Sequence, residues 1–305
     1  MQRWKPRTAP GLWIGLVLLV ITFIATLFFG WRLVQVFILP LEQWPIDMTL
    51  FAELLVSLTL LLLLLLLLYR LLIALTLHYT VDRNAVTLGS IGPTATVPLE
   101  RILHIDSGLQ GATIRHRLFQ GLGAYWGSGR TAQGQPLYLF TSMPPSRSLI
   151  LVTEKASYAL SPAQPERFLQ ELDQRRQMGP SRPVMEQQQS GSLLFHRFWD
   201  DPIVRWAIML AVVLYLALLA LLALLYPTLP PLVPMHFDPS AAVVGFAPRS
   251  DLLLLALAVL LLTLANTALA LISYRRDRVI AYTWQCGAVM VQLLFAIALG
   301  AALAG

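Results

Sequence analysis

Two strand patterns and one helical pattern follow one another in the stretch Leu149-Ile-Leu-Val-Thr-Glu-Lys-Ala-Ser-Tyr-Ala-Leu-Ser-Pro-Ala-Gln-Pro-Glu-Arg-Phe-Leu-Gln-Glu-Leu172. Residues 149–152 and 157–160 are short apolar runs rich in β-branched, aromatic or aliphatic side chains, as buried strands are. Glu154-Lys-Ala156 separates them and favours a tight turn. The stretch therefore predicts a β-hairpin followed by a helix.

The helical pattern has recognisable start signals. Ser161 is a plausible N-cap, and Pro162 or Pro165 then stands in the first turn. Apolar residues share one face of this helix: Phe168, Leu169 and Leu172. We expect that face to close a hydrophobic core.

Upstream of this stretch, further short runs alternate with turn residues such as Asp82-Arg-Asn84. These predicted strands are residues 79–82, 85–88, 95–97, 102–105 and 137–140. Together with the hairpin and helix they predict an antiparallel α+β domain over residues 78–178, called the β domain below. Its fold would be a barrel or sandwich with a C-terminal helix.

The β domain resembles a bacterial pleckstrin-homology domain. The matching residues are Val97-Pro-Leu-Glu-Arg-Ile102, the glycine-rich segment 121–129 and the stretch 149–172. The resemblance covers about a hundred residues and implies a binding or scaffold module.

Composition places this domain in a membrane protein. Hydrophobic residues make up 57% of the 305-residue chain and charged residues only 12%, and residues 60–68 are all leucine or similarly apolar. The formal net charge of +6 does not predict a nucleic-acid partner, because the basic residues flank apolar segments instead of forming one patch. Cys286, the only cysteine, lies in an apolar segment and is interpreted as a packing residue.

The N-terminal region, residues 1–77, predicts a transmembrane hairpin with spans at about 12–31 and 49–70. A cleaved signal peptide is the competing interpretation, but the apolar run is too long and lacks an Ala-x-Ala site. Glu53 lies near the outer end of the second span. We favour an interfacial carboxylate paired with Arg32 over an ion or proton site.

Residues 179–201 read as a polar linker ending in a short interfacial segment, and residues 202–305 as a three-span membrane domain. The spans lie at about 203–226, 252–274 and 279–304. Basic residues at the N-terminus and at Arg275-Arg-Asp-Arg278 predict that the N-terminus and the β domain are cytoplasmic. The C-terminus would then be extracytoplasmic. The whole chain is thus expected to be an integral membrane α-helical protein of about five spans with an inserted cytoplasmic domain.

The loop 226–250 is rich in proline, which predicts extended backbone and an ordered extracytoplasmic cap. It resembles a loop in a multi-spanning domain of unknown function that includes immunity proteins against a sporulation-delay toxin. The residues that carry this resemblance are Leu229, Pro230, Val233, Pro234, His236, Phe237, Asp238, Gly245, Phe246 and Arg249. His236 and Asp238 are too few ligands for zinc, so a histidine bonded to loop carbonyls is the favoured interpretation.

Candidate binding residues in the β domain are basic and aromatic. Arg115 and Arg117, with Arg130, form the best basic cluster for anionic lipid, and Tyr125 and Trp126 stand among glycines that allow a turn. A solvated strand face is the competing and favoured interpretation of the cluster. The sequence contains no nucleotide-binding, catalytic or metal-binding motif that withstands a spacing test, so no cofactor is predicted.

Polar residues deep in the C-terminal spans are few: Asn266, Gln285 and Gln292. Asn266 and Gln285 should lie at nearly equal depth, which predicts an interhelical polar pair that shares a hydrogen bond or a small polar cluster. The favoured function is a non-enzymatic membrane protein with a binding or scaffold domain, in envelope sensing or immunity. A transporter or channel is the alternative, and a membrane enzyme ranks third.

Overall fold

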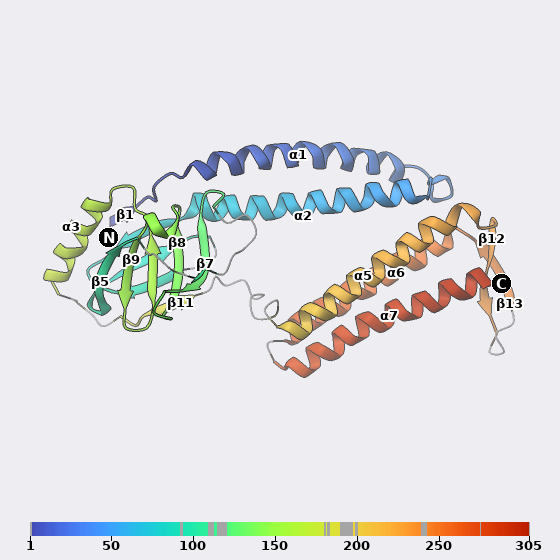
Figure 1. The fold of residues 1–305 in the computed structure, drawn as a ribbon. Helices are drawn as coiled ribbons and strands as arrows, with labels where there is room; N and C mark the ends of the chain where they lie inside the picture. The colour runs from blue at the N-terminus through green and yellow to red at the C-terminus, as the bar shows by residue number, and fades with distance from the viewer. Residues whose placement is uncertain are drawn as a thin grey trace. The chain divides into compact units, whose positions relative to one another are not determined.

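The computed structural model describes residues 2–91, 94–108, 113–114, 121–179, 181, 184–189, 198, 201–238, 243–274 and 276–304. The chain divides into two compact units (Figure 1). One contains Met1–Thr26 and Leu60–Leu193, and therefore the β domain with the adjoining helix ends. The other contains Leu27–Thr59 and Leu194–Gly305.

Five helices are long and apolar enough to cross a membrane, by length and composition. They are α1 (Pro10–Phe37), α2 (Met48–Thr76), α5 (Pro202–Leu225), α6 (Asp251–Ser273) and α7 (Arg278–Ala304). The three expected C-terminal spans coincide with α5, α6 and α7 to within a residue at each end. The two expected N-terminal spans lie inside α1 and α2, which continue beyond residues 31 and 70 to residues 37 and 76. The predicted pair of Arg32 and Glu53 is confirmed, with 2.6 Å between Arg32 Nη2 and Glu53 Oε1.

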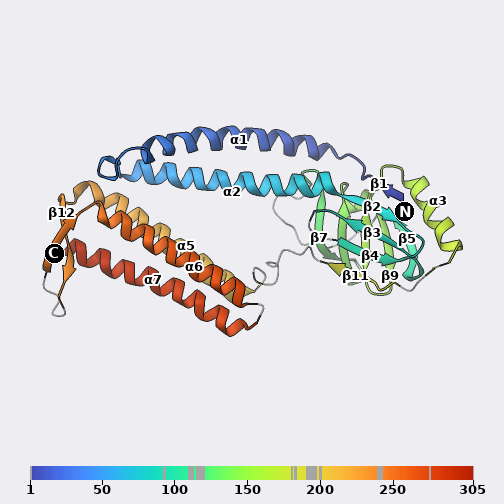
Figure 2. The same cartoon turned by 180° about the vertical axis from the view of Figure 1, so that it is seen from behind.

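The β domain consists of two sheets and one helix, and it includes two strands from outside residues 78–178, at residues 2–4 and 187–189 (Figures 1 and 2). The first sheet has the order β1-β2-β3-β4-β11, built from β1 (Gln2–Trp4), β2 (His78–Val81), β3 (Ala85–Gly89), β4 (Thr94–Pro98) and β11 (Gln187–Gln189). The second has the order β5-β9-β10-β8-β7-β6, built from β5 (Ile102–Ser107), β6 (Thr113–Ile114), β7 (Tyr125–Arg130), β8 (Pro136–Thr141), β9 (Leu149–Thr153) and β10 (Ser157–Leu160).

All the strands expected from the sequence are present, and the helix α3 (Pro165–Gln177) follows them. The prediction of a wholly antiparallel domain is wrong, because β10 pairs parallel with β8. The turn after Thr153 is closed by a bond from the Thr153 amide to the Ala156 carbonyl. The predicted cap at Ser161 is wrong, because α3 begins at Pro165 with Gln164 before it. The Ser161 hydroxyl instead accepts a hydrogen bond from the Ser142 amide.

Both faces of the neighbouring strands β9 and β10 are buried, which explains the uninterrupted apolar run at residues 149–152. Leu149 and Leu151 join the main core with Phe168 of α3, and Ile150 and Val152 join a second cluster. This division follows the alternation of side chains along a strand. The predicted apolar face of α3 is confirmed, since Phe168 and Leu172 are fully buried.

In the second unit, one face of α7 is buried against neighbouring helices. The buried residues on this face recur every three or four positions: Ala281, Gln285, Ala288, Gln292, Phe295 and Leu299. Gln292 Nε2 donates to Thr263 Oγ1 of α6 at 2.7 Å. Helix α7 is therefore the element against which α5 and α6 pack.

The predicted hydrogen bond between Asn266 and Gln285 is not formed. Both polar atoms of the Gln285 side chain are buried without a partner among the described residues. The Asn266 amide lies instead beside Gly287 of α7. Equal depth did not ensure contact, because a difference of two positions along α7 changes the direction of the side chain by about half a turn.

Before α5, the Asp201 carboxylate joins the ends of all three helices. It accepts hydrogen bonds from the hydroxyls of Tyr274 at 2.8 Å and Tyr282 at 2.7 Å, and from the Ile203 amide at 3.0 Å. Burial raises the pKa of Asp201, but these hydrogen bonds outweigh it and hold that pKa below its usual value. Asp201 thus caps α5 and ties it to α6 and α7.

Gln292 and Gln285 provide a matched test of this bundle. We expect Gln292→Leu to lower the free energy of unfolding by about 0.6 kcal/mol, because it removes a bond to Thr263. Gln285→Leu should leave that energy unchanged or raise it, since no hydrogen bond is lost. Unfolding of the purified chain in bicelles would measure both, and the opposite order would contradict the assignment.

Candidate functional site

The structure places the predicted binding residues Tyr125, Trp126 and Arg130 on β7, whereas Arg115 and Arg117 lie outside the described residues. Trp126 makes contacts with α2: the Arg70 guanidinium lies 5.7 Å from its ring centroid and the Tyr69 ring 6.3 Å from it. Arg130 is four residues further along the strand, about 13 Å away. Trp126 therefore packs the β domain on α2, and Arg130 is not part of that contact.

A glycine turn brings the β domain close to both helices. Gly121 and Gly123 have φ values of +96° and +91°, so the predicted turn before the aromatic pair is confirmed. A Cβ atom on Gly123 would lie 2.9 Å from Leu12 Cδ1 and 3.0 Å from Ala74 Cβ. A Cβ on Gly11 would collide with the Gly121 carbonyl. Only glycine allows this packing of α1 and α2 on the turn.

The N-terminal segment, residues 2–9, is built into the β domain. Its strand β1 pairs antiparallel with β2, with Arg3 opposite Thr80. Beyond β1, Pro6 bridges to Pro162, and the amide of Arg7 donates to the Ser161 carbonyl at 2.8 Å. The sequence did not predict this strand, because it is three residues long and proline soon follows it.

Alternation along this segment separates an apolar from a basic side. Trp4 packs edge-on against Phe168, with the ring centroids 5.7 Å apart. Arg3, Lys5 and Arg7 are exposed and alternate with Trp4 and Pro6. The basic side chains therefore share one side of an ordered backbone.

These side chains line a cavity of about 650 Å³, called the basic cavity below. Its other walls come from the start of α1, the end of α2, the first residue of β2 and the core of the β domain, represented by Leu12, Leu75, His78 and Ser142. In the part of the chain that the structure describes, no aspartate or glutamate lines the cavity. Its electrostatic character is therefore cationic.

A network of hydrogen-bonded hydroxyl groups connects the core of the β domain to the N-terminal segment. The Tyr79 hydroxyl donates to the Phe140 carbonyl at 2.7 Å and accepts from the Ser161 amide at 3.1 Å. The Ser161 and Ser142 hydroxyls are 2.8 Å apart, and Ser142 donates to the Arg7 carbonyl. Burial raises the pKa of Tyr79 to about 12, although the bonds with Ser161 lower it.

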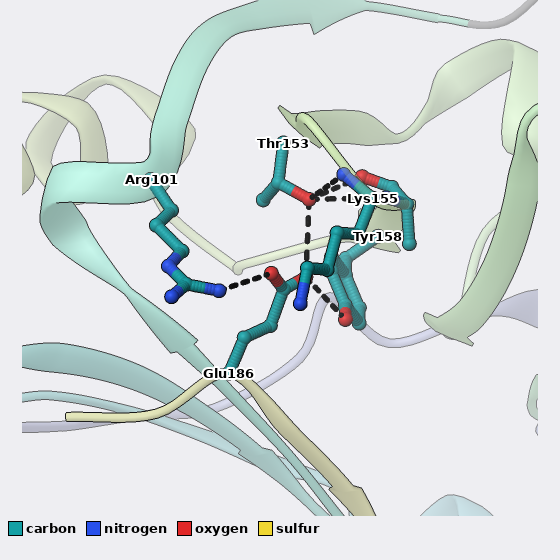
Figure 3. A network of polar contacts seen from close by, with 6 residues as sticks. Arg101, Thr153, Lys155, Tyr158 and Glu186 are labelled. Atoms are coloured by element: carbon teal, nitrogen blue, oxygen red, sulfur yellow. Dashed lines mark hydrogen bonds and ion pairs between the residues drawn. The ribbon is translucent and has the colours of Figure 1, made fainter.

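A second network fixes the segment that follows α3 (Figure 3). Glu186 Oε1 accepts hydrogen bonds from the Tyr158 hydroxyl at 2.9 Å and from Thr153 Oγ1 at 3.0 Å. Arg101 Nη1 lies 3.6 Å from Glu186 Oε2. Burial and the bond to Glu186 raise the pKa of Tyr158. The next residues form β11 on the edge of β4, so this part of the predicted linker is an ordered strand.

The proline-rich loop forms an antiparallel pair of strands, β12 (Leu232–Phe237) and β13 (Val243–Pro248). The extended backbone was predicted, but the strand pairing was not. Arg249 Nη1 donates to the Leu229 carbonyl at 3.2 Å, and its guanidinium lies 4.9 Å from the Tyr226 ring centroid. Arg249 thereby holds the end of α5 to the start of α6.

The predicted bonding of His236 to loop carbonyls can be followed only in part, because residues 239–242 lie outside the described residues. The His236 ring is exposed and lies against Gly245, and within the described loop it makes no hydrogen bond to a carbonyl. Solvent satisfies an exposed imidazole, so no protein carbonyl is needed. Pro234 is paired opposite Phe246, and Asp238 follows β12. The side chain of Phe237 lies outside the described part.

Among the residues that the structure describes, no group of three or more His, Cys, Asp and Glu is arranged to hold a metal ion.

Comparison with known proteins identifies the β domain. Residues 77–176 match the family described as Bacterial PH domain, which spans β2 to α3. No curated protein and no solved structure gives a significant match to the chain. The chain therefore carries a bacterial pleckstrin-homology domain attached to apolar helices, and the strands β1 and β11 are additions outside the matched residues.

Tyr79 should make the free energy of unfolding of the β domain fall as the pH rises in the alkaline range. Because its folded pKa is about 12 and its usual pKa is 10.0, its contribution is complete below pH 10 and is lost as the pH rises towards 12. Tyr79→Phe should flatten the fall in unfolding free energy over that interval. Denaturant titrations at several pH values would measure it, and an unchanged slope would contradict the assignment.

Removing the Glu186 carboxylate should loosen β11. Glu186→Ala leaves the buried Tyr158 hydroxyl without its acceptor, at a cost of about 1–3 kcal/mol. Hydrogen exchange in the full chain should therefore accelerate at the amides of β11. Glu154→Ala, at an exposed position of the same domain, is the matched control and should leave exchange there unchanged. Equal exchange rates at β11 in both variants would exclude a role of the Glu186 carboxylate in holding β11 in place.

Proposed function

We propose that this chain is a non-enzymatic integral membrane protein whose pleckstrin-homology-like domain is a binding and scaffold module. The supporting observation is the way the domain is mounted. Helix α2 ends at Thr76 and β2 begins at His78, so only Leu77, itself buried, separates them. A domain mounted without a flexible linker presents its surface at a fixed distance from the bilayer.

The orientation proposed from basic residues places the β domain in the cytoplasm and the C-terminus outside. The proposed partners are the lipid bilayer together with a protein or anionic lipid at the β domain, and no nucleic acid. The resemblance of loop 226–250 to immunity proteins supports a role in envelope sensing or immunity.

A transporter or channel is the alternative function. The observation that favours it is the pair of glutamines on α7, Gln285 and Gln292, whose side chains are buried in the C-terminal bundle. Amides in that position also serve as interhelical contacts, as the bond from Gln292 to Thr263 illustrates. The scaffold function is the better supported of the two, because it accounts for a β domain that is joined directly to α2 without a flexible linker.

Photo-crosslinking in native membranes tests the scaffold proposal. A crosslinking amino acid at Leu103, which is 56% exposed on the edge strand β5, should give a discrete protein adduct. The same residue at Leu65, 52% exposed on α2, is the control for contact with lipid. Absence of protein adducts from Leu103 and other exposed β-domain positions, together with solute flux in proteoliposomes, would favour the transporter.

A further inference from the structure

We propose that the basic cavity binds the phosphate-bearing head group of an anionic phospholipid from the adjoining leaflet. This site lies outside the basic cluster expected from the sequence, and the inference rests on the proposed membrane location of the chain but not on its scaffold role. It is built by the N-terminal segment, which precedes the family match, and by the junction of α2 with β2.

The cationic groups are available and their backbone is fixed. Among the described residues, Arg3, Lys5 and Arg7 make no ion pair with a carboxylate, and no carboxylate side chain lines the cavity beside them. Pairing of β1 with β2 and the bond between Arg7 and Ser161 hold their backbone in place. An anion that binds here therefore loses little free energy to ordering the chain.

The preference for phosphate follows from the donor groups. Arginine offers a planar fork that matches two phosphate oxygens, and lysine adds a compact charge. Arg3 and Arg7 flank Lys5 at two-residue intervals along one side of an extended segment, about 7 Å apart for each step. The three side chains are long enough at this spacing for several of their N–H donors to reach the oxygens of one phosphodiester.

The remaining walls favour a lipid over free phosphate. Leu12 lies in the first turn of α1 and Leu75, 61% exposed, in the last turn of α2, and both helices are long enough to cross a membrane. A phospholipid can place its phosphate against the cations while its acyl chains continue along these apolar helices. Free phosphate would contact the same cations but gain nothing from Leu12 and Leu75. A volume of about 650 Å³ also lies within the range of small-molecule pockets.

Each basic residue near an anionic membrane surface contributes roughly fivefold to lipid affinity. Replacing Arg3, Lys5 and Arg7 together should therefore weaken retention of phosphatidylglycerol on the order of 100-fold. Phosphatidylcholine is zwitterionic, and its choline cation offsets the charge of its phosphate, so both proteins should retain it equally. Raised salt should weaken binding of phosphatidylglycerol to the native chain.

Native mass spectrometry of the full chain, purified in detergent with mixed phosphatidylglycerol and phosphatidylcholine, provides the test. The variant Arg3→Gln/Lys5→Gln/Arg7→Gln should lose bound phosphatidylglycerol. The control Arg147→Gln/Lys155→Gln/Arg167→Gln removes the same charge from exposed positions of the β domain and should keep it. Equal loss in both variants would show a general charge effect, and retention in both would show that the cavity holds no lipid; either result overturns the proposal.

A second variant leaves the N-terminal charges, and hence the orientation signal, intact. Leu75→Glu places a carboxylate at the cavity wall and should also reduce phosphatidylglycerol retention. Leu72→Glu, one turn earlier on α2 and outside the cavity lining, should not. Competition with inorganic phosphate distinguishes the source of the anion. Displacement of phosphatidylglycerol by millimolar phosphate would identify a free-phosphate site and overturn the assignment to lipid.

Discussion

The backbone pairing of β1 with β2 is the interaction on which the junction between the β domain and the helices depends. It places the N-terminal segment on a sheet edge that would otherwise expose unpaired amide and carbonyl groups. A strand of three residues contributes few hydrogen bonds alone. The contacts of Pro6 with Pro162 and of Arg7 with Ser161 extend the attachment towards α1. The start of α1 is thus fixed relative to β2, which continues from α2.

The opposite edge of the same sheet is covered in a similar way by β11. This strand follows α3 and precedes α5 in the chain, and the buried carboxylate of Glu186 anchors its start. Both segments that leave the β domain towards apolar helices are therefore hydrogen-bonded into its sheet.

Sequence reasoning found the elements that have a local signal and missed those that depend on tertiary contacts. The strands of the β domain carry apolar runs between turn residues, and the pairing of Arg32 with Glu53 follows from opposite charges at equal depth. By contrast, β11 is Gln187–Gln189, without any apolar periodicity, and its place is set by the edge of β4. Ser161 has the chemistry of a helix cap, but Ser142 and Tyr79 compete for it.

In the basic cavity, too, some features have a local sequence signal and others depend on tertiary contacts. The basic residues at the N-terminus are readable as a topology signal from charge alone, whereas their common side requires knowledge that the segment is a strand. A shift of one residue in the register of β1 would turn Arg3 and Lys5 towards Phe168 and move Trp4 outwards. Such a register would bury charge against an aromatic core and expose the indole, both of which are unfavourable. The apolar contact of Trp4 with Phe168 therefore determines where the cations point, and the chemistry of the basic cavity follows from the packing of the core.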